Sequence, residues 1–141
     1  FLNEPDIGTK NHSQYTGEGE ETDVSGFAVK GKNGETQIII YSHNNDREKE
    51  ETQEITVCVN GLCGTEKKLE HYRIDAQHSN PYAEWVRQGK PLFPQGVQYD
   101  AIKARDGLEK LEDDQTVTVT DGKLELKFTM LTHGVSYLVL K

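Results

Sequence analysis

Short runs of apolar residues, either at every second position or β-branched throughout, dominate the chain from about residue 27 onward. Residues 36–42 form a compact β-branched run, and in residues 54–59 the side chains of Ile55, Val57 and Val59 alternate with polar ones. Further runs with strand character cover residues 68–74, 116–120, 123–128 and 134–140. About six or seven short strands at this spacing predict a mainly β domain, an antiparallel β-sandwich.

Turn residues separate the predicted strands. Asn60-Gly61 follows the run 54–59, and Asp121-Gly122 joins the two alternating runs 116–120 and 123–128. Asp-Gly suits a type I′ turn, whose two central residues have positive φ. We therefore predict a β-hairpin over residues 116–128.

The segment at about residues 80–105 has a different pattern and predicts a short helical insertion into the sandwich. Asn80 can cap a helix whose first position is Pro81, and Gly89 can end that helix. Residues 94–102 form a second short helical pattern, in which Val97 and Ala101 share a face.

The chain divides into two parts by composition. Residues 1–24 show no apolar period and are rich in Gly, Glu, Asn and Thr, so we expect an irregular entry segment or linker there. The β-sandwich domain then occupies residues 25–141. A length of 141 residues excludes a (β/α)₈ barrel, which needs about 250. Because the chain begins with Phe1 and shows no signal-peptide pattern, we expect it to be a piece of a longer polypeptide.

The charge balance narrows the classes of partner. Lys and Arg number 16 against 24 Asp and Glu, the net charge is −8, and the mean hydropathy is −0.76. Nucleic acids and anionic membranes are bound mainly by basic patches, so we expect neither as a partner. No run approaches the ~20 apolar residues of a membrane span. The composition indicates a soluble protein and leaves open whether it is cytoplasmic or secreted.

No residue pattern indicates a metal, a cofactor or a nucleophilic triad. The histidines have no metal-ligand spacing; they are His12, His43, His71, His78 and His133. Cys58 and Cys63 bracket the Asn60-Gly61 turn, and a disulfide between them is geometrically allowed if the turn is tight. Gly64 and Thr65 favour a looser loop with free thiols, so both states of the cysteines remain open.

Three aromatic residues of the predicted insertion are candidates for stacking on a sugar ring. Tyr82 and Trp85 lie three positions apart on the first helix, and Tyr99 lies on the second. Planar rings of this kind offer a large apolar face to a pyranose. The alternative interpretation is structural, with Trp85 packing the insertion onto the sandwich.

Several motifs occur together between the middle and the end of the chain. They are Tyr72-Arg73-Ile74-Asp75, His78-Ser79-Asn80, Trp85, Gly89, Pro91, Pro94 and a closing Gly134-Val135-Ser136. This set resembles the C-terminal β-sandwich of glycoside hydrolase family 39, the β-xylosidase family. The resemblance extends over roughly residues 27–140.

The resemblance implies a retaining glycosidase whose (β/α)₈ barrel carries both catalytic glutamates and acts on xylan or xylo-oligosaccharide. It implies that this chain is the non-catalytic accessory domain of such an enzyme, with its own catalytic barrel as partner and a homo-oligomer as a further expectation. No catalytic residue is assigned in the chain. Glu4 lies in an Asn3-Glu4-Pro5 triplet typical of barrel acid/base glutamates, but a three-residue match at a chain end is best explained as coincidence. The alternative function is a free-standing carbohydrate-binding module that uses Tyr82, Trp85 or Tyr99.

Four polar residues predict a structural corner between a strand and the first helix: Asp75, His78, Ser79 and Asn80. Short polar side chains satisfy backbone groups where a strand passes into a helix. Direct contact with a substrate is the alternative role for this segment.

Overall fold

The alternating and β-branched runs form strands in the computed structural model, which describes residues 21–141. The strands are β1 (Asp23–Lys30), β2 (Thr36–His43), β3 (Thr52–Asn60), β4 (Glu66–Ile74), β5 (Glu109–Lys110), β6 (Gln115–Thr118), β7 (Lys123–Leu131) and β8 (Val135–Leu140), and the helices are α2 (Pro81–Arg87) and α3 (Val97–Ala104). The predicted mainly β fold with a short helical insertion is confirmed. Glu4, His12 and most of the predicted entry segment lie outside the described residues.

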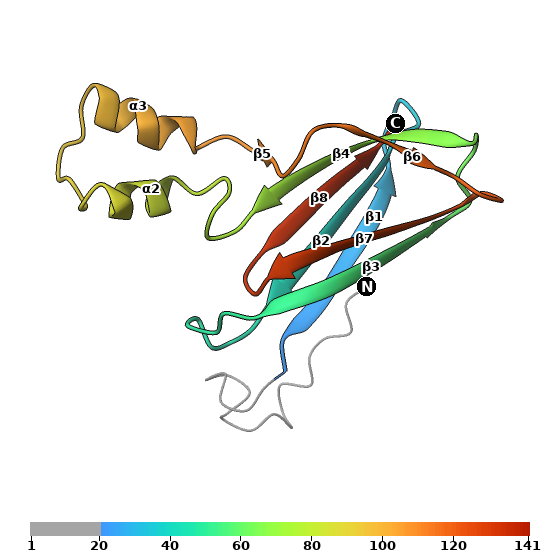
Figure 1. Cartoon of the computed structure of the whole chain (residues 1–141), viewed down its shortest axis with the longest axis horizontal. Helices are drawn as coiled ribbons and strands as arrows, with labels where there is room; N and C mark the ends of the chain where they lie inside the picture. Colours follow the sequence, from blue (N-terminus) through green and yellow to red (C-terminus); the bar gives the residue numbers. More distant parts are fainter. Residues whose placement is uncertain (1–20) are drawn as a thin grey trace.

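Two antiparallel sheets make up the sandwich. The larger sheet has the order β1-β2-β8-β4-β5, with β6 also paired to β4, and the smaller sheet consists of β3 and β7. Figure 1 shows β3 and β7 crossing in front of the larger sheet. In the centre of the larger sheet, Leu138 of β8 lies opposite Ile38 of β2 on one side and His71 of β4 on the other.

The hydrophobic core lies between the inner faces of the two sheets, because every second side chain of a strand points to the same face. Its buried members are Ile38, Ile40, Ile55, Leu69, Leu124, Leu126, Met130, Leu138 and Leu140. β3 and β7 keep the predicted alternation over residues 54–59 and 123–128, with apolar side chains inward and mostly polar side chains outward. The core therefore consists of aliphatic side chains from both sheets. Any polar group buried beside it needs a hydrogen-bond partner.

The predicted hairpin over residues 116–128 is wrong beyond its turn. Asp121 and Gly122 have φ of 51° and 71°, as a type I′ turn requires, and Thr120 pairs with Lys123 across it. The strands then separate, because β6 pairs with β4 in the larger sheet while β7 pairs with β3 in the smaller one. Alternation predicted two strands at the right positions, but it carries no information about which partner each strand finds.

Replacing Gly122 with alanine should lower the free energy of unfolding by about 1 kcal/mol, because an L-residue is strained at positive φ. A Cβ at this position would also lie 3.3 Å from the carbonyl oxygen of Leu62, whose amide donates to the Gly122 carbonyl. Urea unfolding followed by circular dichroism measures the change. Gly107→Ala is the matched control, since a Cβ there meets nothing within 4 Å; equal effects of the two substitutions would contradict the turn assignment.

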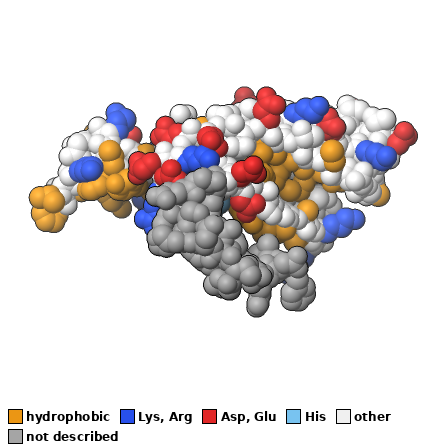
Figure 2. Space-filling view, turned by 90° about the horizontal axis from the view of Figure 1, so that it is seen from below, with side chains coloured by type: hydrophobic (Ala, Val, Ile, Leu, Met, Phe, Trp, Pro, Cys, Tyr) orange, Lys and Arg blue, Asp and Glu red, His pale blue; other side chains and the backbone are white. Residues whose placement is uncertain are grey.

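The helical insertion extends away from one end of the sandwich, with α2 and α3 side by side (Figure 1). Its connecting loop and the first residue of α3 are strongly apolar and exposed: Leu92, Phe93 and Val97 are 88%, 84% and 85% exposed. Figure 2 shows hydrophobic side chains gathered at the end of this projection. Neither described helix has the length and apolar character of a membrane-spanning segment.

Candidate functional site

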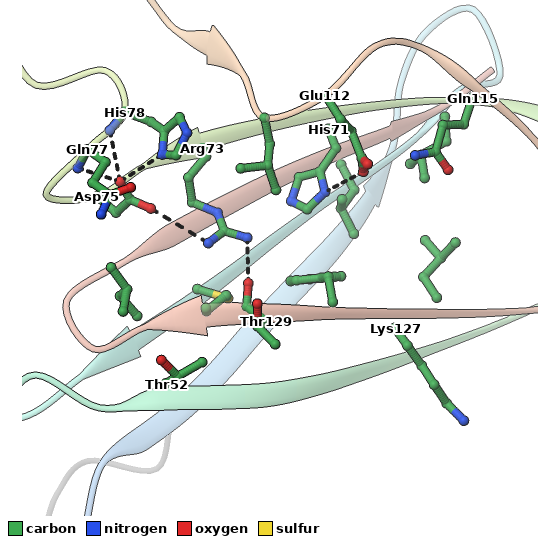
Figure 3. A pocket seen from close by; sticks show the side chains of 17 residues that line it. Thr52, His71, Arg73, Asp75, Gln77, His78, Glu112, Gln115, Lys127 and Thr129 are labelled. Carbon is green, nitrogen blue, oxygen red and sulfur yellow. Dashed lines mark hydrogen bonds and ion pairs between the residues drawn. The ribbon is translucent and has the colours of Figure 1, made fainter.

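A cavity of about 670 Å³ lies between the sheets, on the side where β6 and β7 separate. Alternation along β4 points His71 and Arg73 inward, and Asp75 follows directly after the strand. Figure 3 shows these three side chains between β4 and β7, with Glu112 at the side of His71. Apolar side chains of both sheets form much of the remaining wall. The cavity thus combines an apolar lining with a small number of buried polar groups, which is the usual composition of a binding site.

Arg73 joins the two sheets across this cavity. The residue is only 3% exposed, and its Nη2 donates to the backbone carbonyl of Thr129 on β7 at 2.9 Å. Its Nη1 lies 3.7 Å from Oδ2 of Asp75, and the guanidinium carbon lies 5.8 Å from the centre of the Phe128 ring. The remaining nitrogen, Nε, has no hydrogen-bond partner within the described part of the chain. A buried guanidinium needs such partners because an isolated buried charge is strongly unfavourable.

Asp75 organises the corner that follows β4. Its Oδ1 accepts from the backbone amides of Gln77 and His78 at 2.7 and 2.8 Å, and it contacts Nδ1 of the His78 ring at 2.9 Å. Burial by itself raises the pKa of the Asp75 carboxyl, but these hydrogen bonds outweigh burial and hold the pKa below its usual value. Asp75 is therefore an ionised acceptor and has no proton to give near neutral pH.

Ser79 and Asn80 complete the corner. The Ser79 hydroxyl donates to the carbonyl of Arg73 at 2.7 Å and accepts from the amide of Glu109 at 2.8 Å. Asn80 donates through Nδ2 to the carbonyl of Asp75, and its Oδ1 accepts from the amide of Ala83 at 2.9 Å as the cap of α2. In the structure the four residues of the predicted corner lie together and bind backbone and one another.

Replacing Asn80 with alanine should lower the free energy of unfolding by about 1 kcal/mol, because the first turn of α2 loses its cap. The amide of Ala83 should also exchange faster with solvent deuterium, which reports the cap directly. Gln95→Ala, in the loop before α3, is the control and should change neither quantity. An unchanged exchange rate at Ala83 in the Asn80 variant would contradict the capping role.

His71 is buried at the base of the cavity. Its Nε2 lies 3.0 Å from the hydroxyl of Ser136, and its ring packs edge-on against Phe128. Nδ1 lies 3.5 Å from Oε1 of Glu112, whose side chain is 43% exposed. Burial, together with the nearby charge of Arg73, lowers the pKa of His71 from 6.5 to about 4, so the ring is neutral at pH 7.

The sequence matches a family model over residues 22–122, and that family is the glycosyl hydrolases family 39. The chain belongs to glycosyl hydrolase family 39. The match includes the whole of β4 and ends at the turn before β7. No curated protein shows significant sequence similarity to this family 39 chain.

The family 39 chain is similar in fold to one part of several larger solved structures. It is similar to a family 39 enzyme from Xanthomonas axonopodis pv. citri (TM-score 0.69, 14% identity, 82% of this chain and 25% of that one) and to a monomeric β-xylosidase from Caulobacter crescentus (TM-score 0.69, 16% identity, 82% and 26%). A bacterial orthologue of human α-L-iduronidase has the same TM-score at 13% identity, with 83% and 22% covered. At these identities the likeness shows the fold, and the chain spans about a quarter of the length of each structure.

The aromatic candidates lie on the projecting insertion, away from the cavity. The rings of Tyr82 and Trp85 are 5.6 Å apart and inclined by 38°, and Tyr82 is 64% exposed. Trp85 donates through its indole nitrogen to the carbonyl of Pro91 at 2.9 Å, so its hydrogen bond holds the loop of the insertion itself. Tyr99 is exposed on α3 and makes no ring contact with either of them among the described residues.

The remaining chemistry-bearing side chains are dispersed. Residues 21–141 contain no group of three or more His, Cys, Asp or Glu side chains placed to hold a metal ion. Cys58 and Cys63 are free thiols, and both are exposed, so the structure contains no disulfide between them.

Sequence reasoning did not single out the partners of Arg73 and His71. One signal was available, because alternate positions of the predicted strand 68–74 carry Leu69, His71 and Arg73. Two polar residues on the same face as a leucine indicate buried polar groups that need partners. Their partners Thr129 and Ser136 lie more than 50 residues away in sequence. Only the pairing of β4 with β8 and its packing against β7 brings these groups together.

Proposed function

We propose that this family 39 chain is a non-catalytic accessory domain that supports the catalytic barrel of a glycoside hydrolase. The observation that carries the proposal is the family match over residues 22–122 in a chain that spans only about a quarter of the similar enzymes. The similarity to a β-xylosidase favours xylan and xylo-oligosaccharides as the substrates of the whole enzyme, which we take to be a retaining glycosidase.

The chemistry of the cavity also favours a structural role. Glycoside hydrolysis uses two carboxyl groups, one of which must hold a proton near neutral pH. Asp75 is kept ionised by its hydrogen bonds and faces Arg73, while Glu112 lies on the exposed side of His71. Most polar groups of the cavity are therefore engaged with one another, and together they join the two sheets.

Removing this domain from the complete gene product tests the supporting role. Deletion of residues 25–141 should lower the thermal midpoint of the remaining enzyme and reduce its rate of 4-nitrophenyl β-D-xyloside hydrolysis several-fold. Differential scanning fluorimetry and initial rates measure the two effects. A truncated enzyme with unchanged midpoint and rate would contradict the proposal, as would a complete gene product that contains no barrel-sized segment.

One observation favours the second candidate function, a carbohydrate-binding module: the rings of Tyr82 and Trp85 are adjacent and Tyr82 is well exposed. Affinity electrophoresis in gels containing xylan separates the two functions. An accessory domain that supports a barrel migrates equally with and without xylan. Retardation that is lost in Tyr82→Ala, but kept in a Phe93→Ala control, would instead favour the module.

A further inference from the structure

The larger sheet leaves one face uncovered by any described element. This outer face consists of the side chains of β1, β2, β8 and β4 that point away from β3 and β7. The strand register arranges them in three rows: Ser25, Tyr41, Val135 and Ile74; Phe27, Ile39, Tyr137 and Tyr72; and Val29, Gln37, Val139 and Glu70.

Apolar side chains dominate the outer face although solvent reaches it. Phe27, Val29 and Ile74 are 58%, 51% and 45% exposed, and the aromatic residues between them are partly buried against one another. The Tyr72 and Tyr137 rings lie 5.8 Å apart, and the Tyr137 hydroxyl donates to Gln37 at 2.9 Å. The one carboxylate of the three rows, Glu70, lies at the margin and is bound by Lys141. A contiguous apolar face of this kind marks an interaction site on a soluble protein.

The smaller sheet of the same molecule shows what a water-facing surface of this domain looks like. The outward positions of β3 and β7 are almost all polar or charged: Thr52, Glu54, Thr56, Cys58, Asn60, Lys123, Glu125, Lys127 and Thr129. Antiparallel sheets with one face in water alternate apolar and polar residues in this way. β2 and β8 instead carry nearly continuous apolar runs, as strands do when both of their faces are buried.

We infer that the outer face of the larger sheet is the surface on which the catalytic barrel of the same polypeptide packs, an inference that rests on the proposed function. The length of the similar enzymes identifies the occupant, because about three quarters of each lies outside the part that this chain matches. A face four strands wide and nearly free of charge fits a large apolar partner surface better than a polar ligand. A second copy of this chain is the competing occupant, and the experiment below distinguishes it from the barrel.

The test compares two substitutions in the complete gene product. Phe27→Glu places a charge on the outer face, and Thr56→Glu places the same charge on the polar face of the smaller sheet. Both positions lie on strands at the edge of their sheets and are exposed, so neither substitution disturbs the core. We expect Phe27→Glu to lower the thermal midpoint of the complete gene product by several degrees and Thr56→Glu to leave it unchanged. In this 141-residue chain alone both variants should keep the parent midpoint.

Hydroxyl-radical footprinting provides a readout that does not depend on stability. Tyr41, Tyr72 and Tyr137 should be oxidised several-fold more slowly in the complete gene product than in this chain alone. Equal oxidation rates, or equal effects of the two substitutions, would overturn the inference while leaving an active barrel enzyme and hence the proposed function intact. The three tyrosines could instead be oxidised slowly already in this chain alone. If analytical ultracentrifugation then showed the chain changing from monomer to dimer as its concentration rises, the face would be assigned to a second copy. A complete gene product that contains no barrel would instead overturn the proposed function.

Discussion

Replacing Asp75 with alanine should lower the free energy of unfolding by about 3 kcal/mol, because removing one member of a buried ion pair leaves the other charge uncompensated. Arg73 and Asp75 are both almost fully buried, and within residues 21–141 Arg73 would keep only the Thr129 carbonyl as a hydrogen-bond partner. The amides of Gln77 and His78 would lose their acceptor as well. Urea unfolding measures the loss.

Two further variants make this result specific. Asp106→Ala removes the partner of Lys103 in an exposed ion pair and should leave stability unchanged. Arg73→Met combined with Asp75→Ala should be more stable than Asp75→Ala alone, since no unpaired charge remains. If the double variant were the less stable of the two, Arg73 would not depend on Asp75 in the way the structure indicates.

The stability of the fold should fall by about 2 kcal/mol between pH 6.5 and pH 4 through His71 alone. The folded pKa of about 4 lies below the usual 6.5, so unfolding takes up a proton in this interval. The neutral ring contributes its stability fully above pH 6.5, and this contribution is lost as the pH falls toward 4. The full shift corresponds to about 3 kcal/mol, which partial screening by solvent reduces.

Unfolding at a series of pH values measures this slope. His71→Gln cannot titrate but can still bond to Ser136, so the variant should show a flatter profile between pH 6.5 and 4.5. The contribution of Asp75 to stability is lost only as the pH falls below the ordinary pKa of 3.8 for an aspartate. The effects of His71 and Asp75 therefore occur in different pH ranges. A variant with the same slope as the parent, or a His71 ring that titrates near 6.5 by NMR, would refute the burial of a neutral ring.

Local chemistry accounts for the parts of the molecule that the sequence predicts well. Alternation located β3 and β7, and an apolar run after a turn located β8. The Asp121-Gly122 turn follows from the positive φ that only few residue types adopt readily. The bonds of Ser79 and Asn80 to nearby backbone are local in the same sense, since most of them span six residues or fewer. Such features depend on neighbours in the chain.

Features that depend on distant partners were missed or misassigned. β1 has no counterpart among the predicted strands, because both faces of this edge strand are largely exposed and Gly26 interrupts its apolar residues. The strand predicted to pair with β6 was wrong, because Thr116 and Val117 fit the edge of β4 as well as they fit a hairpin. The Arg73 bond to Thr129 requires the packing of two sheets, which no local pattern encodes.

The proposed accessory role requires the glycosidase chemistry to lie outside these 141 residues. The most direct measurement is the rate at which the purified chain releases 4-nitrophenol from 4-nitrophenyl β-D-xyloside, compared with the Glu4→Gln variant and with buffer. We predict that neither protein exceeds the rate in buffer. Hydrolysis by the chain that disappears in the Glu4→Gln variant would contradict the claim and place a catalytic carboxylate within this sequence.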